Sequence, residues 1–380
     1  MRRLPLAALA TLAGLGLLSG TAAHAQPFGV FDARSAGMGG VGVATGARYA
    51  TFNNPSLLVT ASDEQEWFLM IPGVSRRRGD SNDLQANLDS FQQAADRLDA
   101  DPTPANADTV QASLAALEGG MYREGGNGAI LLAVPSRILS GAAYMHVYDW
   151  SNARTRIAGD DLGNPADPQY ASRIEYRGAR VLENGISAAK VIGGTGWRRQ
   201  MAVGFNFKFL FVEGYGYSEG VRGAKLGIDR GQRYSNGSAF NLDLGLLKEF
   251  GVWKLGLMGK NLFSSRFEYG DTGEYFKISP QLRGGIAYQS RRTVFELDMD
   301  LMRNEAAGFD GATQMISLGT EFKPIHWLAL RAGYQQNITG SRLGSASLGM
   351  GLAAGFLTFD LAGTYGKEEL GAYAQLGLQF

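Results

Sequence analysis

Three carboxylates occur at alternate positions in one segment of the chain: Glu296, Asp298 and Asp300. In an extended strand alternate side chains point to one face, so they would stand in a row. A calcium or magnesium site would need a compact cage of oxygens that nothing in this segment provides. We therefore predict ion pairs in the interior, which either stiffen the protein or line a polar permeation path. The expected basic partners are Arg283 on the neighbouring strand, and Lys254, Lys260 and Arg331 elsewhere.

Few residues could support enzymatic chemistry. The chain has no cysteine, which excludes disulfides, thiolate metal sites and thiol catalysis. His326 adjoins Trp327 in a predicted turn, and His146 lies in a predicted strand without a local serine or aspartate pattern. A hydrolase would need a nucleophile beside a base. We expect neither an enzymatic activity nor a cofactor or metal.

The charge balance limits the class of partner. Lys and Arg together number 36, as do Asp and Glu. Without a basic excess or a basic stripe, a nucleic-acid-binding surface has no electrostatic support. The mean hydropathy of −0.12 is near neutral. A soluble protein has such a value, and so does a β-barrel with a polar interior, because its apolar residues are spread along alternating strands.

The first 25 residues have the pattern of a signal peptide. Arg2 and Arg3 precede an apolar stretch from Leu4 to Leu18, and Ala23 and Ala25 form an A-x-A cleavage site. Beyond this segment no run approaches the ~20 apolar residues that a membrane helix needs. The mature chain is therefore expected in the periplasm, outside the cell or in the membrane as a barrel.

The carboxy-terminal segment alternates strictly between an apolar and a polar face. Its apolar face consists of Leu370, Ala372, Ala374, Leu376, Leu378 and Phe380. The same period of two recurs in 201–211, 294–302 and 356–361. This period predicts half-buried strands. A terminal aromatic residue also resembles the recognition signal of outer-membrane barrels.

The lengths of the connections distinguish a barrel from a soluble sandwich. Short and long links alternate along the chain, and membrane barrels have an even number of antiparallel strands with short turns on the periplasmic side. We therefore predict an all-β antiparallel transmembrane β-barrel of about 14 strands over residues 63–380. The predicted strands lie near 65–77, 127–135, 138–151, 173–192, 199–218, 237–250, 252–266, 277–290, 292–304, 313–323, 325–336, 344–353, 355–366 and 370–380.

Aromatic residues near the predicted strand ends support the same conclusion. A barrel carries two aromatic belts, one at each membrane boundary. The belt at the short turns is predicted to contain Trp67, Trp197, Phe250, Trp253, Trp327 and Phe380. The opposite belt is predicted to contain Tyr148, Trp150, Tyr215, Tyr217, Tyr334 and Tyr365.

An insertion at about 80–125 breaks the strand pattern. Leu84, Leu88, Phe91 and Leu98 recur at helical spacing, and Asn82 or Asp83 is available as a helix cap. Prolines 102 and 104 interrupt the run before a second apolar series begins. We predict an inserted helical hairpin on the outer side, either as a lid on the barrel rim or as a gate or partner-docking surface.

Residues 26–62 are predicted to be a hatch, that is, a plug segment inside the barrel. They are rich in Gly and Ala and contain a formal GxGxxG match from Gly37 to Gly42. A dinucleotide site would also need a preceding strand, a following helix and a distant acidic residue, which are not found here. The residues expected to define the hatch are Ser35, Gly37, Met38, Gly39, Gly40, Gly42, Asn54 and Pro55.

The segments 35–44 and 52–58 resemble the amino-terminal motif of FadL-like outer-membrane proteins, and more closely its plasmid-transfer TraF-like branch. The segments 83–98, 259–262, 297–301 and 330–334 are also similar to that branch. Ser56 departs from the alanine that usually follows the Asn-Pro pair. The resemblance implies a fourteen-stranded barrel with an internal hatch in the Gram-negative outer membrane.

Two functions remain open at this stage. The closer resemblance implies an envelope component associated with plasmid transfer, with other transfer proteins as partners. The wider resemblance implies a channel that takes up a hydrophobic small molecule. Arg76 to Arg78, at the outer end of a predicted strand, could contact lipopolysaccharide phosphates, and membrane lipid is expected around the barrel. An apolar pocket beside the hatch would favour uptake, and an exposed apolar patch on the insertion would favour the transfer role.

Overall fold

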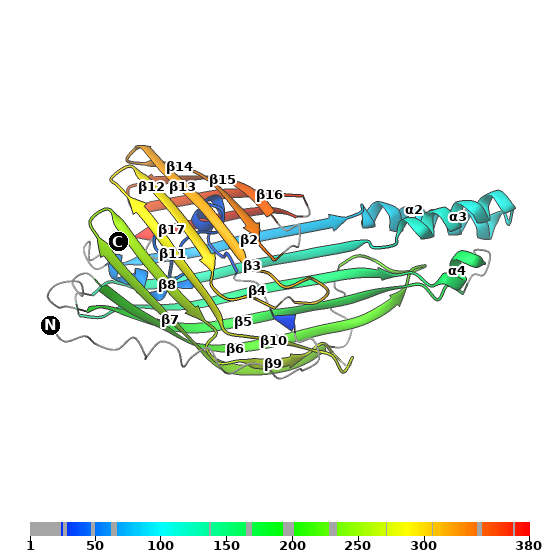
Figure 1. Cartoon of the computed structure of the whole chain (residues 1–380), viewed down its shortest axis with the longest axis horizontal. Helices are drawn as coiled ribbons and strands as arrows, with labels where there is room; N and C mark the ends of the chain where they lie inside the picture. Colours follow the sequence, from blue (N-terminus) through cyan, green and yellow to red (C-terminus); the bar gives the residue numbers. More distant parts are fainter. Residues whose placement is uncertain are drawn as a thin grey trace, which may run out of the picture.

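The computed structural model describes residues 24–25, 29–46, 50–61, 67–136, 138–164, 169–192, 201–227, 234–270, 272–305, 307–339, 344–367 and 369–380. Within these residues fourteen antiparallel strands form one closed barrel, and three short strands form a separate sheet (Figure 1). The predicted fold class is therefore confirmed. The predicted signal peptide lies outside the described residues, except that His24–Ala25 form the short strand β1.

The barrel closes where β17 pairs with β2. At this seam the backbones of Trp67 and Phe380 exchange two hydrogen bonds, with N···O distances of 2.6 and 3.0 Å. The barrel strands are β2 (Phe68–Ser81), β3 (Met121–Val134), β4 (Ser140–Arg156), β5 (Arg173–Ile192), β6 (Met201–Gly220), β7 (Tyr234–Phe250), β8 (Trp253–Lys260), β11 (Gln281–Gln289), β12 (Thr293–Asp300), β13 (Met315–Ile325), β14 (Leu328–Asn337), β15 (Gly344–Ala354), β16 (Leu357–Gly366) and β17 (Leu370–Gln379).

The two ends of the barrel differ in their connections. One end, here called the turn end, has the seam residues and most of the tight links. These tight links are 251–252, 290–292, 326–327 and 355–356. The other end, here called the loop end, has the longer links 82–120, 157–172, 221–233, 261–280 and 301–314. This asymmetry is typical of outer-membrane barrels, in which the turn end faces the periplasm.

Two strands are shorter than the sequence predicted. The alternation over 252–266 and 277–290 suggested long strands, but β8 ends at Lys260 and β11 begins at Gln281. Asn261 ends β8 because its backbone is left-handed, with φ of 54°. Its N–H donates to Oδ1 of Asp243 at 2.8 Å, which fixes the change of direction.

The chain between β8 and β11 forms a small hairpin of β9 (Ser265–Glu268) and β10 (Tyr275–Ile278). It lies against the inner face of β6, where a Cβ on Gly214 would come within 1.9 Å of the Glu268 carbonyl oxygen. Only glycine allows this approach. Phe267 and Phe276 of the hairpin are buried, so this hairpin contributes apolar side chains to the barrel interior.

Side chains along the barrel strands alternate between lipid and interior. On β12, Leu297 is 41% exposed whereas Asp298 is 0% exposed. On β6, Phe207 and Phe209 are exposed and Lys208 between them is buried. The charged residues of these strands therefore face the interior, as the alternation predicted.

The aromatic belts match the prediction at the turn end but only partly at the loop end. Trp67, Phe250, Trp253, Trp327 and Phe380 are exposed at the turn end, and Tyr334 and Tyr365 are exposed at the other. The assignment of Tyr148, Trp150 and Tyr215 to the outer belt was wrong, because all three side chains are buried. Trp197 lies outside the described residues.

The insertion forms a helical hairpin that extends from the loop end (Figure 1). It consists of α2 (Leu84–Ala100) and α3 (Pro104–Ala116). Asp83 precedes α2, as predicted, but its side chain makes no capping hydrogen bond. Thr103 caps α3, since its side chain accepts from the N–H of Asn106. In the described part of the chain, no helix has the length and apolar character needed to cross a membrane.

The apolar side of the hairpin is covered by the protein itself. Leu88 and Phe91 of α2 pack with Leu114 of α3, and the same cluster contains Tyr176 and Val221 at the loop end of the barrel. Residues 82–120 are all described, and none of their large apolar side chains is exposed. The insertion therefore packs on the barrel rim and leaves no apolar patch for a partner.

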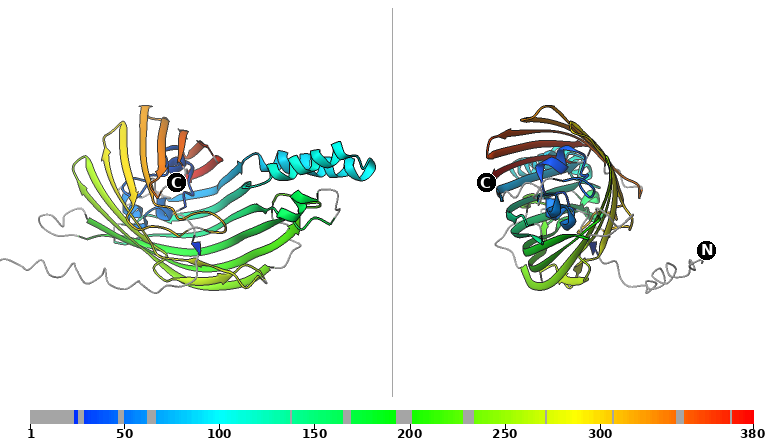
Figure 2. Two further views of the ribbon diagram at one scale, coloured as in Figure 1. Left: turned by 45° about the vertical axis from the view of Figure 1, so that its right-hand side comes forward. Right: turned by 90° about the vertical axis from the view of Figure 1, so that its left-hand side faces the viewer.

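The described hatch residues, 29–46 and 50–61, lie inside the barrel (Figure 2). They form the short helix α1 (Ala33–Gly37) and the 3-10 helices η2 (Ala50–Phe52) and η3 (Pro55–Ala61). Asp32 caps α1, because its side chain accepts from the N–H of Ser35 at 2.8 Å. The described part of the hatch contains no strand, so its backbone must find hydrogen-bond partners elsewhere.

Candidate functional site between the hatch and the barrel wall

Four aromatic side chains follow one another on the inner face of β4: Tyr144, His146, Tyr148 and Trp150. Their spacing of two places them on a single face of the strand, and all four are buried. They extend along the strand towards the loop end. We call this row the aromatic ladder.

Two rings of the hatch pack against the ladder. The ring centroid of Phe31 lies 4.3 Å from that of His146 and 5.7 Å from that of Tyr148. The ring of Phe52 lies 4.9 Å from Tyr144 and 5.2 Å from His146. These separations are those of edge-to-face and tilted aromatic pairs. The hatch thus meets β4 through packed rings.

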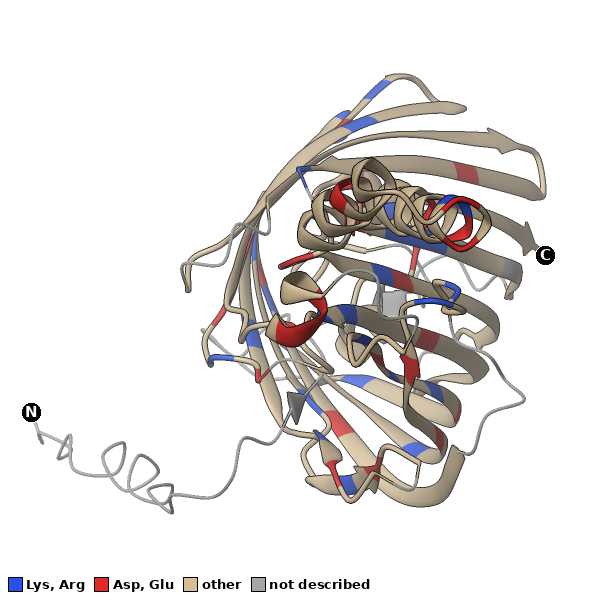
Figure 3. Cartoon of the chain, turned by 90° about the vertical axis from the view of Figure 1, so that its right-hand side faces the viewer, with Lys and Arg blue, Asp and Glu red and all other residues tan. Residues whose placement is uncertain are grey.

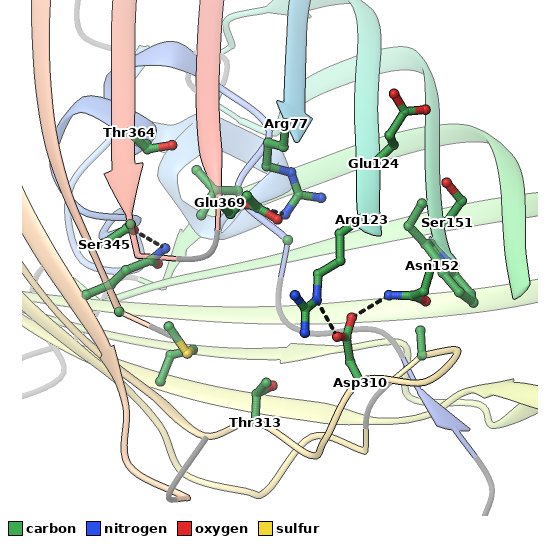
Figure 4. A pocket seen from close by; sticks show the side chains of 18 of the residues that line it. Arg77, Arg123, Glu124, Ser151, Asn152, Asp310, Thr313, Ser345, Thr364 and Glu369 are labelled. Atoms are coloured by element: carbon green, nitrogen blue, oxygen red, sulfur yellow. Dashed lines mark hydrogen bonds and ion pairs between the residues drawn. The ribbon is translucent and has the colours of Figure 1, made fainter. Parts of the chain in front are cut away.

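A cavity of about 180 Å³ lies at the loop end of the ladder. Gly29 and Val30 of the hatch line it on one side, and Trp150 of the ladder on another. Polar side chains and the apolar Ala307 and Met315 complete the lining, and Figure 4 shows two ion pairs among the lining residues. Arg77 lies 3.6 Å from Glu369, and Arg123 lies 2.6 Å from Asp310. The cavity therefore combines an aromatic floor with a charged rim.

The described residues 307–312 of the β12–β13 loop fold over this cavity. Asp310 binds Arg123 and also accepts from Nδ2 of Asn152 at 2.7 Å. Gly308 has a left-handed backbone with φ of 65°, which favours glycine, and a Cβ there would come within 1.9 Å of Oδ1 of Asn152. We call this segment the lid.

Two arginines contact the side chain of Phe309 in the lid. The guanidinium of Arg154 lies 4.0 Å from the ring centroid of Phe309, and that of Arg177 lies 5.3 Å from it. Arg177 in turn binds Glu274 at 2.8 Å. This hydrogen bond from Arg177 lowers the pKa of Glu274 below its ordinary value. The lid is thus fixed by charge–charge and cation–π contacts at the loop end.

The hatch backbone binds two of the carboxylates singled out in the sequence. Oδ2 of Asp298 accepts from the N–H groups of Gly42 and Val43, at 2.8 and 3.1 Å. Oε1 of Glu296 accepts from Ala44 and Thr45, at 2.7 and 3.0 Å. Hydrogen bonds to a carboxylate are stronger than neutral ones. These two side chains therefore supply the partners that a hatch without a strand needs.

The third carboxylate has the basic partner that was predicted. Asp300 lies 2.7 Å from Nε of Arg283, and Arg283 also donates to the carbonyl oxygen of Gly40 at 3.1 Å. Asp300 further accepts from the side chain of Asn304 and from the N–H of Met315. This pair therefore connects the barrel wall to the hatch as well.

A second group of buried charges, of which only Arg331 was foreseen in the sequence, holds α1. Arg34 lies 3.1 Å from Glu321, which binds Arg331 at 2.7 Å. Arg331 then binds Asp360 at 2.6 Å. All four side chains are buried. Desolvation of buried charges is costly unless each is paired. Because Arg34 belongs to the hatch, Glu321 has this partner only while the hatch is in place.

The other three predicted basic residues contact groups outside the row on β12. Arg331 pairs with Glu321 and Asp360, as described above. Lys254 pairs with Glu249 at 2.5 Å. Lys260 has its Nζ 4.3 Å from the ring centroid of Phe31. The prediction of one network was wrong for these residues, because the hatch backbone already occupies Glu296 and Asp298.

The residues predicted to define the hatch form hydrogen bonds within the hatch, form hydrogen bonds to the barrel wall, or pack against the wall. Ser35 accepts from Nδ2 of Asn53 at 2.8 Å, and Gly39 donates to Oγ of Ser347 at 2.8 Å. Asn54 donates to the carbonyl oxygens of Val43 and Leu246. The remaining ones, Gly37, Met38, Gly40, Gly42 and Pro55, pack against or bond to the wall.

Wall glycines make these close contacts possible. Gly319 and Gly333 are directly paired on β13 and β14, and Cβ atoms on them would come within 2.3 and 2.1 Å of the Met38 backbone. Gly204 and Gly245 are likewise paired on β6 and β7, beneath Pro55. The abundance of glycine in the sequence thus has a structural cause in part: the hatch lies directly on the wall backbone.

Residues 51–300 match one family model, which is described as "F plasmid transfer operon, TraF, protein". The chain belongs to this family. None of the curated proteins compared with it matches.

Solved structures of FadL-like channels share the fold. The Pseudomonas putida toluene transporter TodX is 12% identical, with a TM-score of 0.56 over 93% of this chain and 98% of that one. A Pseudomonas aeruginosa FadL homologue is 11% identical, with a TM-score of 0.55 over 94% of this chain and 99% of that one. The chain is thus an outer-membrane β-barrel with the architecture of FadL-like channels, and at this identity the likeness concerns the fold alone.

Proposed function

We propose that this protein is an outer-membrane channel that admits a small molecule with an apolar, aromatic body. The aromatic ladder on β4 carries this proposal. It begins at the cavity under the lid and continues beside the hatch, where Phe31 and Phe52 pack on it. An apolar ring can exchange contacts with such a row without losing hydrogen bonds.

The distribution of hatch contacts indicates where the passage opens. Towards β12 and β13, the hatch is held by Glu296, Asp298 and Glu321 through charged hydrogen bonds. Towards β4, it is held through the rings of Phe31 and Phe52. Ring contacts are individually weaker than charge-assisted hydrogen bonds. We therefore place the opening on the β4 side.

This function can be tested by the uptake of radiolabelled toluene in cells that produce the protein as an additional outer-membrane channel. We expect faster uptake than in cells without the protein, and faster still for Phe31→Ala, which removes the ring in front of the ladder. Phe207→Ala, a change on the lipid face of β6, is the matched control and should leave uptake unchanged. No uptake above background for either the wild type or Phe31→Ala would overturn the proposal.

A role in a plasmid-transfer apparatus is the second candidate. The family description favours it, and so does the helical hairpin, which extends from the loop end and carries many acidic residues (Figure 3). Its acidic members are Asp83, Asp89, Asp96, Asp99, Asp101, Asp108 and Glu118. We rank this role second because the insertion presents no exposed apolar patch.

Deleting residues 82–120 separates the two candidates. The hairpin packs on the rim, so the deleted protein should still form a heat-modifiable barrel. Under the transfer role, plasmid transfer frequency should fall while toluene uptake persists. Unchanged transfer frequency would exclude a role of the hairpin in transfer, and failure of the barrel to assemble would show that the hairpin is required for folding.

A further inference from the structure

The imidazole of His146 is buried in the aromatic ladder with one nitrogen unpaired. The side chain is 1% exposed, and its Nε2 has no hydrogen-bond partner among the described residues. The rings of Phe31, Phe52 and Tyr148 surround it. Buried polar atoms nearly always have a partner, and an unpaired one is unfavourable. A ligand that supplied this partner would therefore bind with an advantage.

The ring of Phe31 packs against His146, and the two residues before Phe31 in the chain line the cavity. Its neighbours Gly29 and Val30 line the cavity, and a Cβ on Gly29 would come within 2.4 Å of Cζ of Phe31. The ring therefore folds back beside Gly29, which lines the cavity, and it also packs against His146. It packs well against the imidazole at 4.3 Å, but it has no atom that could bond to Nε2.

We propose that Phe31 occupies the site of the ligand's own ring, and that the preferred ligand is a hydroxylated aromatic ring whose hydroxyl group bonds to Nε2 of His146. This inference rests on the proposed uptake function and names its substrate class. A hydrocarbon ring would only replace the contacts of Phe31. A phenol would replace them and also satisfy the buried nitrogen.

The neighbouring groups agree with a neutral, oxygen-bearing ring. In a neutral imidazole Nε2 either donates or accepts, depending on the tautomer, and a hydroxyl group can do both. The ammonium of Lys260 lies 4.3 Å from the centroid of the Phe31 ring, so a ring in the same place would keep this cation–π contact. A cationic ligand would be repelled by the same ammonium.

Fluorine NMR on the full-length protein in detergent tests the inference with two probes that differ in one group. The probes are 4-fluorophenol and 4-fluorotoluene. We expect the wild type to bind 4-fluorophenol about tenfold more tightly, which is the ratio that one added hydrogen bond of ordinary strength gives. His146→Phe keeps an aromatic ring but removes the nitrogen, so it should abolish this preference.

Phe31→Ala and Phe31→Leu provide a second measurement. Removing the resident ring should tighten the binding of both probes while their ratio is kept. Heat-modifiable mobility on gels verifies that each variant is folded, and Phe31→Leu replaces Phe31→Ala if the latter fails to fold.

The outcomes distinguish the inference from the proposed function. Equal affinity of the wild type for both probes, or a preference that survives in His146→Phe, would overturn the inference while uptake of apolar rings stands. Binding of neither probe, in the wild type and in the Phe31 variants, would overturn both.

Discussion

Arg34 of the hatch and Glu321 of β13 form a buried ion pair of 3.1 Å, although 287 positions separate them in the chain. Glu321 also binds Arg331, whose second partner is Asp360, so one carboxylate pairs with two guanidinium groups. Buried ion pairs therefore hold the hatch to the barrel wall. The polar side of the hatch is held by such pairs, and the opposite side faces the aromatic ladder.

Glu321→Gln should destabilise the protein strongly. Removing one partner of a buried ion pair costs about 3–5 kcal/mol, because a charge is left without compensation. Unfolding in lipid vesicles by denaturant measures the loss. Lys323→Ala is the control, since Lys323 is 3.7 Å from Glu321 but half exposed, and exposed pairs contribute about 0–1 kcal/mol. Similar losses for both variants would show that Glu321 does not hold the two arginines.

Leu297→Arg and Asp298→Asn test the two faces of β12. Arginine on the lipid face costs about 2–4 kcal/mol near the midplane of the membrane. Asp298→Asn should cost less, because Oδ2 accepts both hatch N–H groups and an amide oxygen can take the same place. Unfolding of both variants in the same lipid gives the comparison. A larger loss for Asp298→Asn would contradict the assigned facing of this strand.

The lid should loosen in acid. The pKa of Glu274 is lowered by the hydrogen bond from Arg177, which also contacts Phe309 of the lid. A lowered pKa stabilises the folded protein above the unfolded-state value of about 4.3, and this contribution is lost as the pH falls through the folded-state value. Hydrogen exchange of residues 307–310, corrected for intrinsic rates, should therefore rise below about pH 4.

Two variants verify that Glu274 is the group responsible for this acid response. Glu274→Gln should show faster exchange of the lid than the wild type at neutral pH and a smaller rise in acid, since Asp310 still binds Arg123. Glu305→Gln changes an exposed carboxylate at the start of the same loop and should behave as the wild type. An unchanged acid response in Glu274→Gln would assign the effect to another group.

The number of strands, their order and the alternation of faces could be predicted from the sequence, because a period of two and the lengths of the links are local properties. The aromatic ladder was misassigned for a physical reason. Tyr148 and Trp150 lie near the end of the predicted strand 138–151, and aromatic residues at strand ends commonly mark the membrane boundary, but β4 continues to Arg156. Neither face of 143–151 is uniformly apolar, so the alternation alone did not show which one points inward.

The partners of the hatch could not be predicted. Basic side chains were the obvious partners for Glu296 and Asp298, since the sequence does not show where the N–H groups of an irregular segment lie. Arg34 stands alone in a Gly- and Ala-rich stretch, and its partner is distant in sequence. Such contacts depend on the closed barrel, which brings the wall strands around the hatch.

The last prediction concerns Gly319 and Gly333, the paired wall glycines that contact the hatch backbone. A Cβ on Gly333 would come within 2.1 Å of the Met38 carbonyl carbon, so Gly333→Ala must displace the hatch backbone. Gly363→Ala is the control, because the nearest atom to its Cβ would be 3.9 Å away. The natural chain lacks cysteine, so Val41→Cys introduces a single thiol, which is buried at the hatch.

Labelling of Val41→Cys by a membrane-impermeant maleimide reports the position of the hatch. We expect the thiol to be protected in the otherwise unchanged protein and in Gly363→Ala. In Gly333→Ala, in which close packing is lost, we expect the thiol to react several times faster. Heat-modifiable mobility should be retained in all three, since the wall strands keep their hydrogen bonds. Equal protection in Gly333→Ala would mean that the hatch does not rest on this pair of glycines, and fast labelling in all three would place the segment outside the barrel.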